Sequence, residues 1–145
     1  MSNLVWDQFE VSEFFVHDTK PFPLEDDDGH EYHAEDQSLS VDVVILPVRS
    51  IVCVTIMSRA DGHIVMDLSL LARSPLTRRR MNDDDSLYCH ECSVLPGLRG
   101  YREVQWYTHF PYAAEPSRAV SAQLTCFPHI ALRLYDIAHD NRALR

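Results

Sequence analysis

Short hydrophobic runs and alternating positions dominate the middle of the chain. Residues 41–48 and 51–57 are rich in β-branched side chains, which is typical of buried strands. Residues 64–71 alternate between apolar and more polar positions, which predicts a strand with two unlike faces. Asp61 and Gly62 stand between the last two runs, and Asp-Gly readily adopts the positive φ angles of a tight turn. The pattern therefore predicts a β-hairpin over residues 51–71.

Weaker patterns occupy both ends of the chain. Residues 102–110 alternate, and residues 122–127 and 130–137 are apolar runs on either side of Pro128. These three segments are predicted as strands, although the last also fits helical spacing. The apolar pattern of residues 4–17 fits two alternatives equally: a strand around positions 9–11, or a short helix that ends before Pro21.

Two long segments, residues 18–40 and 72–100, lack a usable apolar period. We expect both to be irregular loops. At 145 residues the chain is predicted to be one domain, residues 1–145. The fold class is mainly β, with α+β as the alternative: a single-domain antiparallel β-sandwich or barrel-like sheet carrying two long irregular loops.

Negative charge is concentrated in the first third of the chain. Residues 1–50 contain twelve acidic residues and two basic ones, whereas residues 51–145 contain ten acidic residues and eleven arginines, for a net charge of −9. Such asymmetry acts on partner choice and association rate. Arg78-Arg79-Arg80 is followed closely by Asp83-Asp84-Asp85, so an internal clamp between arginine and aspartate is expected and direct nucleic-acid binding is not.

No apolar run approaches the roughly 20 residues needed to cross a bilayer, so we expect no membrane partner. The first residues lack the basic and apolar pattern of a secretory signal. Cys53 and Cys126 lie in apolar runs and are predicted to be reduced core residues. A cytoplasmic location is expected, in the host cytoplasm if the protein is viral.

The candidate metal ligands are Cys89 and Cys92 with His30 and His33. Thiolates three positions apart can bind one zinc ion from a tight turn, but a structural site usually has four ligands. The two histidines would complete such a set, and zinc would then order both irregular segments. The simpler interpretation is that both pairs occur by chance and that the protein holds no cofactor. A redox pair is a further alternative, without the βαβ context that such pairs usually have.

No catalytic residue can be assigned. The sequence has no nucleophile elbow, zinc-protease helix or P-loop, and its four glycines leave little for a phosphate-binding loop. An enzyme is therefore less expected than a binding protein.

The leading hypothesis is a small acidic protein-binding module that acts as an inhibitor, antagonist or adaptor. It would dock its acidic N-terminal third on a basic surface of another protein. A nucleic-acid-binding surface is one candidate. This composition has the general character of bacterial immunity proteins and of phage-encoded inhibitors, an analogy that assigns no family. The predicted contact residues are Asp26, Asp27, Asp28, Glu31, Glu35, Asp36 and Tyr107.

Two alternatives belong to other classes. One is a zinc-containing enzyme or ligand-binding domain with its site at His30, His33, Cys89 and Cys92. The other is a structural or assembly subunit of a virus or secretion system, since sandwich-type folds serve many roles. The sequence does not predict an oligomeric state.

Overall fold

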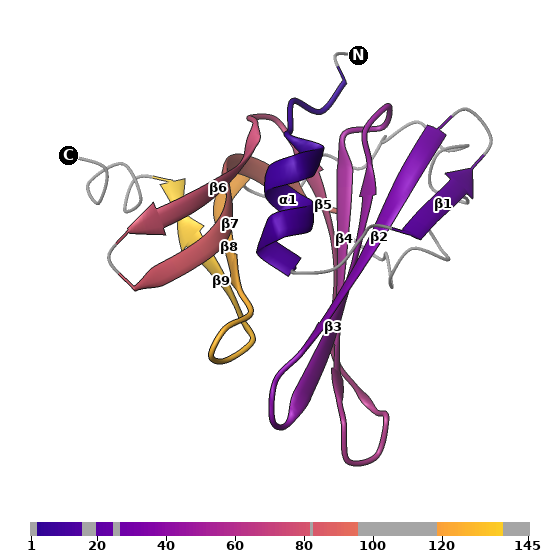
Figure 1. Cartoon of the computed structure of the whole chain (residues 1–145). Coiled ribbons are helices and arrows are strands. Elements are labelled where there is room, and N and C mark those ends of the chain that lie inside the picture. The colour runs from indigo at the N-terminus through magenta and orange to yellow at the C-terminus, as the bar shows by residue number, and fades with distance from the viewer. Residues whose placement is uncertain (1–2, 16–19, 25–26, 82, 96–118, 138–145) are drawn as a thin grey trace.

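The computed structural model describes residues 3–15, 20–24, 27–81, 83–95 and 119–137. These residues form one helix and one antiparallel sheet (Figure 1). The elements are α1 (Gln8–Phe15), β1 (Lys20–Leu24), β2 (Asp27–Glu35), β3 (Leu39–Leu46), β4 (Ile51–Ser58), β5 (Ile64–Ala72), β6 (Leu76–Met81), β7 (Asp84–Val94), β8 (Ala119–Thr125) and β9 (Ala131–Asp136). The strand order is β1-β2-β3-β4-β5-β7-β8-β9, and β6 also pairs with β7.

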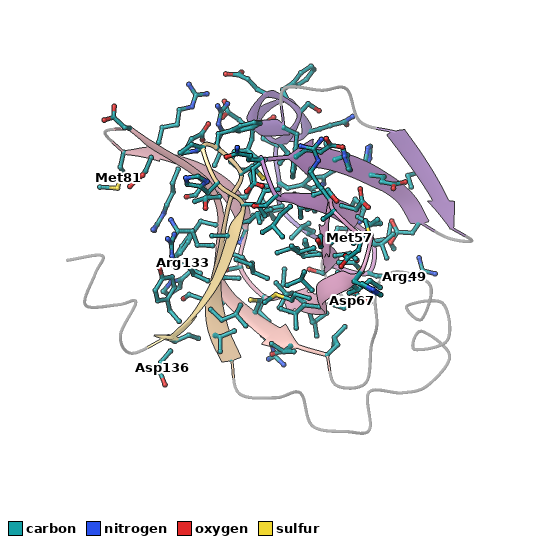
Figure 2. The ribbon with its side chains drawn as sticks, turned by 90° about the horizontal axis from the view of Figure 1, so that it is seen from below. Arg49, Met57, Asp67, Met81, Arg133 and Asp136 are labelled. Carbon is teal, nitrogen blue, oxygen red and sulfur yellow. The ribbon has the colours of Figure 1, made fainter. Side chains whose placement is uncertain are left out.

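The sheet bends where β5 passes into β6. The end of β5 pairs with residues 92–94 of β7, and β6 pairs with residues 84–89 of the same strand. Seen end-on, the sheet curls around a central mass of side chains, with β2–β5 on one side and β7–β9 on the other (Figure 2). The barrel-like, open form of the predicted mainly-β fold is therefore the one observed.

The main core cluster lies on the inner face of the curled sheet. On the opposite face of β3 and β4, apolar residues are buried as well, namely Val44, Leu46, Ile51 and Cys53. On the inner face, alternate residues of β3 and β4, among them Val43 and Val54, are buried, as expected for strands with a period of two. Helix α1 adds Phe14 and Phe15, both almost fully buried. The ring of Phe15 stacks on Tyr32 of β2 with centroids 5.1 Å apart. Burial of such rings supplies much of the hydrophobic free energy that holds α1 on the sheet.

The N-terminal segment forms a helix, which decides between the two predicted alternatives. Asp7 caps it, because its Oδ1 accepts hydrogen bonds from the backbone N–H groups of Phe9 (2.9 Å) and Glu10 (3.2 Å). An aspartate followed three positions later by a glutamate is a sequence signature of a helix start. That signal was present in the sequence and outweighs the strand-like alternation of Phe9 and Val11.

The prediction of two irregular segments is wrong. Residues 18–40 contain β1, β2 and the start of β3, and residues 72–100 contain β6 and β7. Their polar residues are accommodated by the sheet: in β2, Tyr32 and Ala34 face the core while His33 and Glu35 face outward. In the β6–β7 hairpin, Arg80 lies opposite Asp85. Cross-strand pairs of opposite charge stabilise strands that hydrophobic periodicity does not reveal.

The predicted strands of the middle and the C-terminal part are confirmed where the structure describes them. They are β3, β4, β5, β8 and β9, the last being a strand and not a helix. Gly62 in the turn between β4 and β5 has a φ of 73°, which suits the Asp-Gly pair. The predicted strand at 102–110, with Tyr107, lies outside the described residues. Within those residues, no helix combines the length and apolar character needed to cross a bilayer.

Candidate functional site

Carboxylates gather on the outer face of the sheet, opposite the core. His33, Asp42, Thr55 and Asp67 are direct cross-strand neighbours on β2, β3, β4 and β5. They alternate along each strand with core residues, so they share the outer face. We call the carboxylates of this surface the outer acidic face; they are Glu31, Glu35, Asp42 and Asp67.

His33 joins two of these carboxylates. Its Nδ1 lies 2.6 Å from Asp42 Oδ1, and its Nε2 lies 2.9 Å from Glu35 Oε1. Partial burial of the ring opposes protonation, but the hydrogen bonds and charges of Asp42 and Glu35 outweigh it and raise the pKa of His33.

Arg59 holds the second oxygen of the Glu35 carboxylate. Its Nη2 lies 3.3 Å from Glu35 Oε2, and its Nη1 donates to the backbone oxygen of Asp36. The hydrogen bond from His33, followed by the charge of Arg59, lowers the pKa of Glu35. Among the described residues, four carboxylates thus share this face with Arg59 and His33, and their summed charge is negative whether His33 is neutral or protonated.

Two predicted contact residues have structural roles instead. The Asp27 side chain is fully buried and lies 3.3 Å from Arg49 Nη1; it also accepts backbone hydrogen bonds from Val48 and Arg49. Asp36 accepts backbone hydrogen bonds from Ser38, Leu39 and Ile130. Asp27 therefore cannot present its charge to a partner. Both carboxylate oxygens of Asp36 already accept hydrogen bonds from the backbone.

The remaining predicted contact residues divide by position. Asp28 and Glu35 are exposed and Glu31 is partly exposed, although both oxygens of Glu35 already contact His33 and Arg59. Asp26 and Tyr107 lie outside the described residues.

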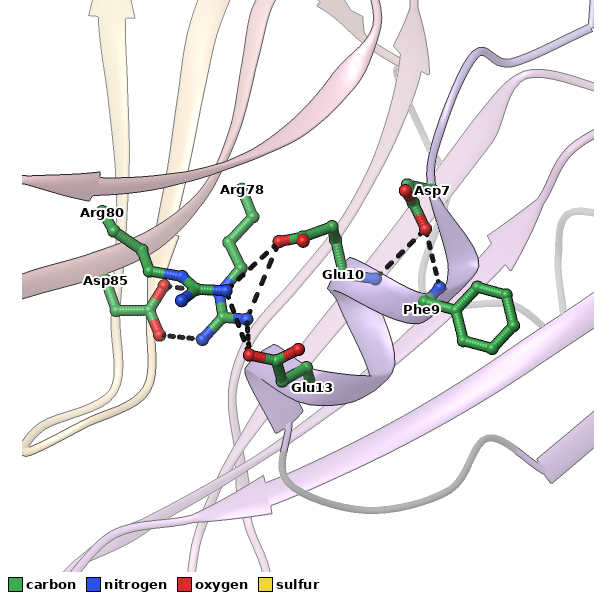
Figure 3. Close-up of polar contacts among 7 residues, drawn as sticks. All are labelled: Asp7, Phe9, Glu10, Glu13, Arg78, Arg80 and Asp85. Atoms are coloured by element: carbon green, nitrogen blue, oxygen red, sulfur yellow. Dashed lines mark hydrogen bonds and ion pairs between the residues drawn. The ribbon is translucent and has the colours of Figure 1, made fainter.

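A second charged cluster joins α1 to the β6–β7 hairpin (Figure 3). Arg78 binds Asp85 through two hydrogen bonds, Nε to Oδ1 at 2.9 Å and Nη2 to Oδ2 at 2.7 Å. Its Nη1 lies 3.0 Å from Glu13 Oε1. The predicted clamp between the arginine and aspartate runs is thus confirmed for this pair. The side chain of Arg78 is only 8% exposed.

The contribution of α1 to this cluster was not predicted from the sequence. Arg80 Nη2 lies 3.0 Å from Glu13 Oε1 and 3.5 Å from Glu10 Oε2. Asp7, Glu10 and Glu13 are spaced three apart, which places them on neighbouring positions of one helical face. That spacing was the available signal, once the segment is taken as a helix.

The four candidate zinc ligands are not brought together. Cys89 and Cys92 lie on β7 around a register shift and both face the core, where they help to line an apolar cavity of about 30 Å³. His30 packs edge-on against the ring of Trp6, and His33 binds carboxylates. Among the described residues, which include all four, no group of three or more potential metal ligands lies together.

The two thiols of β7 interact with each other. The hydrogen bond from Cys92 is the main cause that lowers the pKa of Cys89, and the same bond, together with burial, raises the pKa of Cys92. All four cysteines are free and buried. A buried thiol pair against an apolar cavity has little access to oxidants or metals in solution.

Comparisons with known proteins identify a similar fold. No family model matches the chain, and no curated protein matches it. Among solved structures, the fold is similar to a chain of the contact-dependent growth inhibition toxin–immunity protein complex from Klebsiella pneumoniae 342, with a TM-score of 0.63 and 19% sequence identity. The match covers 92% of this chain and 97% of that chain. At this identity the likeness shows the fold alone.

Proposed function

We propose that this protein is an immunity-type inhibitor, a cytoplasmic protein that binds a toxic partner protein and blocks it. Nearly the whole chain is similar in fold to a chain of a complex between a growth-inhibition toxin and an immunity protein. The net charge of −9 suits the inhibitor of such a pair, because a toxin that acts on nucleic acid needs a cationic surface.

The outer acidic face is the observation that carries this proposal. It spans β2 to β5 and holds four carboxylates against Arg59 and His33. An anionic surface on a rigid sheet attracts a cationic partner, raises the association rate and disfavours acidic proteins. We assign the docking role to Glu31, Glu35, Asp42 and Asp67, with Asp28 at the far end of β2.

Expression of the chain alone in a bacterial host is the first experiment, because it separates inhibitor from toxin. An immunity-type protein leaves growth unchanged. Growth arrest by this chain would assign it to the toxic side of such a pair and overturn the proposal.

Affinity capture from the native lysate at low and high salt is the second experiment. The expected partner is a basic protein that is captured at low salt and lost at high salt, and that arrests growth when it is expressed without this chain. The proposal fails if the captured partners are acidic and insensitive to salt.

The two other hypotheses remain separate predictions. A zinc site would appear as about one equivalent of metal per chain after purification without added zinc, as structural zinc sites hold their ion tightly. An assembly subunit would appear as a symmetric oligomer that persists at low protein concentration.

A further inference from the structure

A cleft of about 370 Å³ lies between β6 and the segment that leads into α1. The N–H of Leu76 donates to the backbone oxygen of Val5, and Trp6 forms a parallel bridge with Leu76. These contacts hold the N-terminal segment alongside β6. The walls of the cleft are apolar, formed by Trp6, Val11 and Pro75 among others, whereas Asp7 and Glu10 supply carboxylates at its side.

The charges around this cleft are unbalanced. Three carboxylates, those of Glu10, Glu13 and Asp85, lie within ion-pair distance of the guanidinium groups of Arg78 and Arg80. The carboxylate of Asp7 caps the helix at the other side of the cleft. Arg78 also lines the cleft, but Asp85 and Glu13 hold its guanidinium at short distances. Counted over the described residues of this cluster, four carboxylates against two guanidinium groups leave an excess of two negative charges beside the apolar walls.

Glu10 and Asp7 have acceptor capacity to spare. Glu10 Oε2 lies 3.7 Å from Arg78 and 3.5 Å from Arg80, longer than the 3.0 Å contacts of Glu13. Only Oδ1 of Asp7 is used in capping the helix. Over the described part of the chain, Asp7 Oδ2 and Glu10 Oε1 have no hydrogen-bond or ion-pair partner.

We propose that this cleft binds the side chain of an arginine from the partner protein. The inference rests on the proposed function in one respect: it takes the partner to be basic. An arginine has an apolar stem and a charged end, which match the apolar walls and the carboxylates of the cleft. Its planar guanidinium also stacks on aromatic rings and forms paired hydrogen bonds with carboxylates, and Trp6 with Glu10 offers both. A lysine ammonium would gain less from the ring.

The test uses N-acetyl-arginine-methylamide as the probe at constant ionic strength. Its neutral isostere, N-acetyl-citrulline-methylamide, is the matched control ligand. In two-dimensional NMR of the full chain, the arginine probe should shift the Trp6 indole and the amides of Glu10 and Thr77. We expect a Kd in the low millimolar range, about two- to fivefold below that of the citrulline probe, since one exposed ion pair contributes up to about that factor.

Two variants remove charge and keep the helix start. Asp7→Asn retains a good N-cap residue, and Glu10→Gln retains the side-chain shape at the third helical position. Each should weaken binding of the arginine probe about threefold or more. Asp61→Asn in the turn between β4 and β5, an exposed carboxylate outside both the cleft and the outer acidic face, is the matched control and should leave the affinity unchanged. Unfolding midpoints of all three variants show whether the fold is intact.

The inference is overturned if the shifts fall elsewhere, if the citrulline probe binds equally well, or if the Asp61 variant weakens binding as much as the others. It is also overturned if no shift occurs up to about 50 mM probe, a concentration at which a contact of this strength would be occupied. These readouts need no partner protein. Failure here would leave the inhibitor proposal standing, and failure of the growth experiments would leave the arginine site standing.

Discussion

The carboxylate of Asp36 accepts a 2.7 Å hydrogen bond from the backbone nitrogen of Ile130, which lies 94 residues further along the chain. Asp36 follows β2, and Ile130 directly precedes β9. These strands belong to opposite halves of the sheet order, so the contact links the two arms of the curled sheet. It also keeps the outer face of β2–β5 in a fixed position relative to β8 and β9.

Asp36→Ala should therefore destabilise the fold. The substitution leaves three backbone N–H groups without their acceptor, and we expect the free energy of unfolding to fall by about 2–4 kcal/mol. Urea denaturation followed by circular dichroism measures this. Asp28→Ala is the control at an exposed carboxylate, where a change within about 0.5 kcal/mol is expected. Equal effects of the two variants would contradict the linking role of Asp36.

The stabilisation by Asp36 should also depend on pH. Burial favours a higher pKa, but the hydrogen bonds from the backbone of Ile130, Leu39 and Ser38 outweigh it and lower the pKa of Asp36. A lowered pKa gives stability that is present above the unfolded-state pKa of about 3.9 and is lost as the pH falls through the folded-state value. The difference in stability between the wild type and Asp36→Asn should shrink as the pH falls below about 4. A constant difference down to pH 2 would contradict this assignment.

Arg78 and Arg80 provide a matched pair for the cluster between α1 and β7. Arg78→Ala leaves Asp85 and Glu13 without their main partner at a site that is 8% exposed, and should cost about 2–4 kcal/mol of unfolding free energy. Arg80 is 53% exposed, so Arg80→Ala should cost about 0.5 kcal/mol or less. Both values come from the same urea titration. If Arg80→Ala proved as costly as Arg78→Ala, burial would not be the reason for the effect.

His33 should titrate above its ordinary pKa of about 6.5, because Asp42 and Glu35 stabilise its protonated form. Its contribution to stability is then fully present below the unfolded-state pKa and is lost as the pH rises through the folded-state pKa. NMR titration of the imidazole measures the shift. Asp42→Asn should move the pKa of His33 downward, and an unchanged value would exclude the 2.6 Å contact with Asp42 as the cause.

Removal of divalent metal tests the arrangement of the four candidate zinc ligands. The structure places Cys89 and Cys92 on β7 in the hydrophobic core, and both histidines lie elsewhere. Chelation with EDTA should therefore leave the Tm unchanged within about 1 °C. Loss of a structural zinc site, by contrast, typically unfolds a domain. Cys92→Ala should raise the pKa of Cys89, because it removes the hydrogen-bond donor that is the main cause of the lowered value. Thiolate absorbance during a pH titration measures this change. A large fall in Tm on chelation would restore the metal hypothesis.

Hydrophobic patterning predicted the sheet where apolar residues dominate. Strands β3, β4 and β5 with their Asp-Gly turn followed from β-branched runs and alternation. It failed for β2 and β7, because their outward positions carry His33, Glu35 or Asp85 and their inward positions include small or polar side chains such as Ala34 and Cys89. Whether such segments form strands depends on how they pair with neighbouring strands, and one sequence alone does not contain that information.

The candidate site was predicted only in part. Charge counting located the acidic third of the chain and the Arg78–Asp85 clamp, but charge counting is blind to burial. It could not separate Asp27, which is enclosed with Arg49, from Asp28, which is exposed. It also missed Asp42 and Asp67 as members of one face, since they meet only through the register of β2–β5.

The association rate between this protein and its captured partner tests the central claim most directly. The claim is that the outer acidic face recognises a cationic protein surface. We predict that the rate constant falls at least about tenfold between 25 and 300 mM salt, and that Glu31→Gln combined with Glu35→Gln lowers it at low salt, because long-range attraction is screened within about 10 Å at 0.1 M salt. A rate that is independent of salt and unchanged in the double variant would contradict the claim.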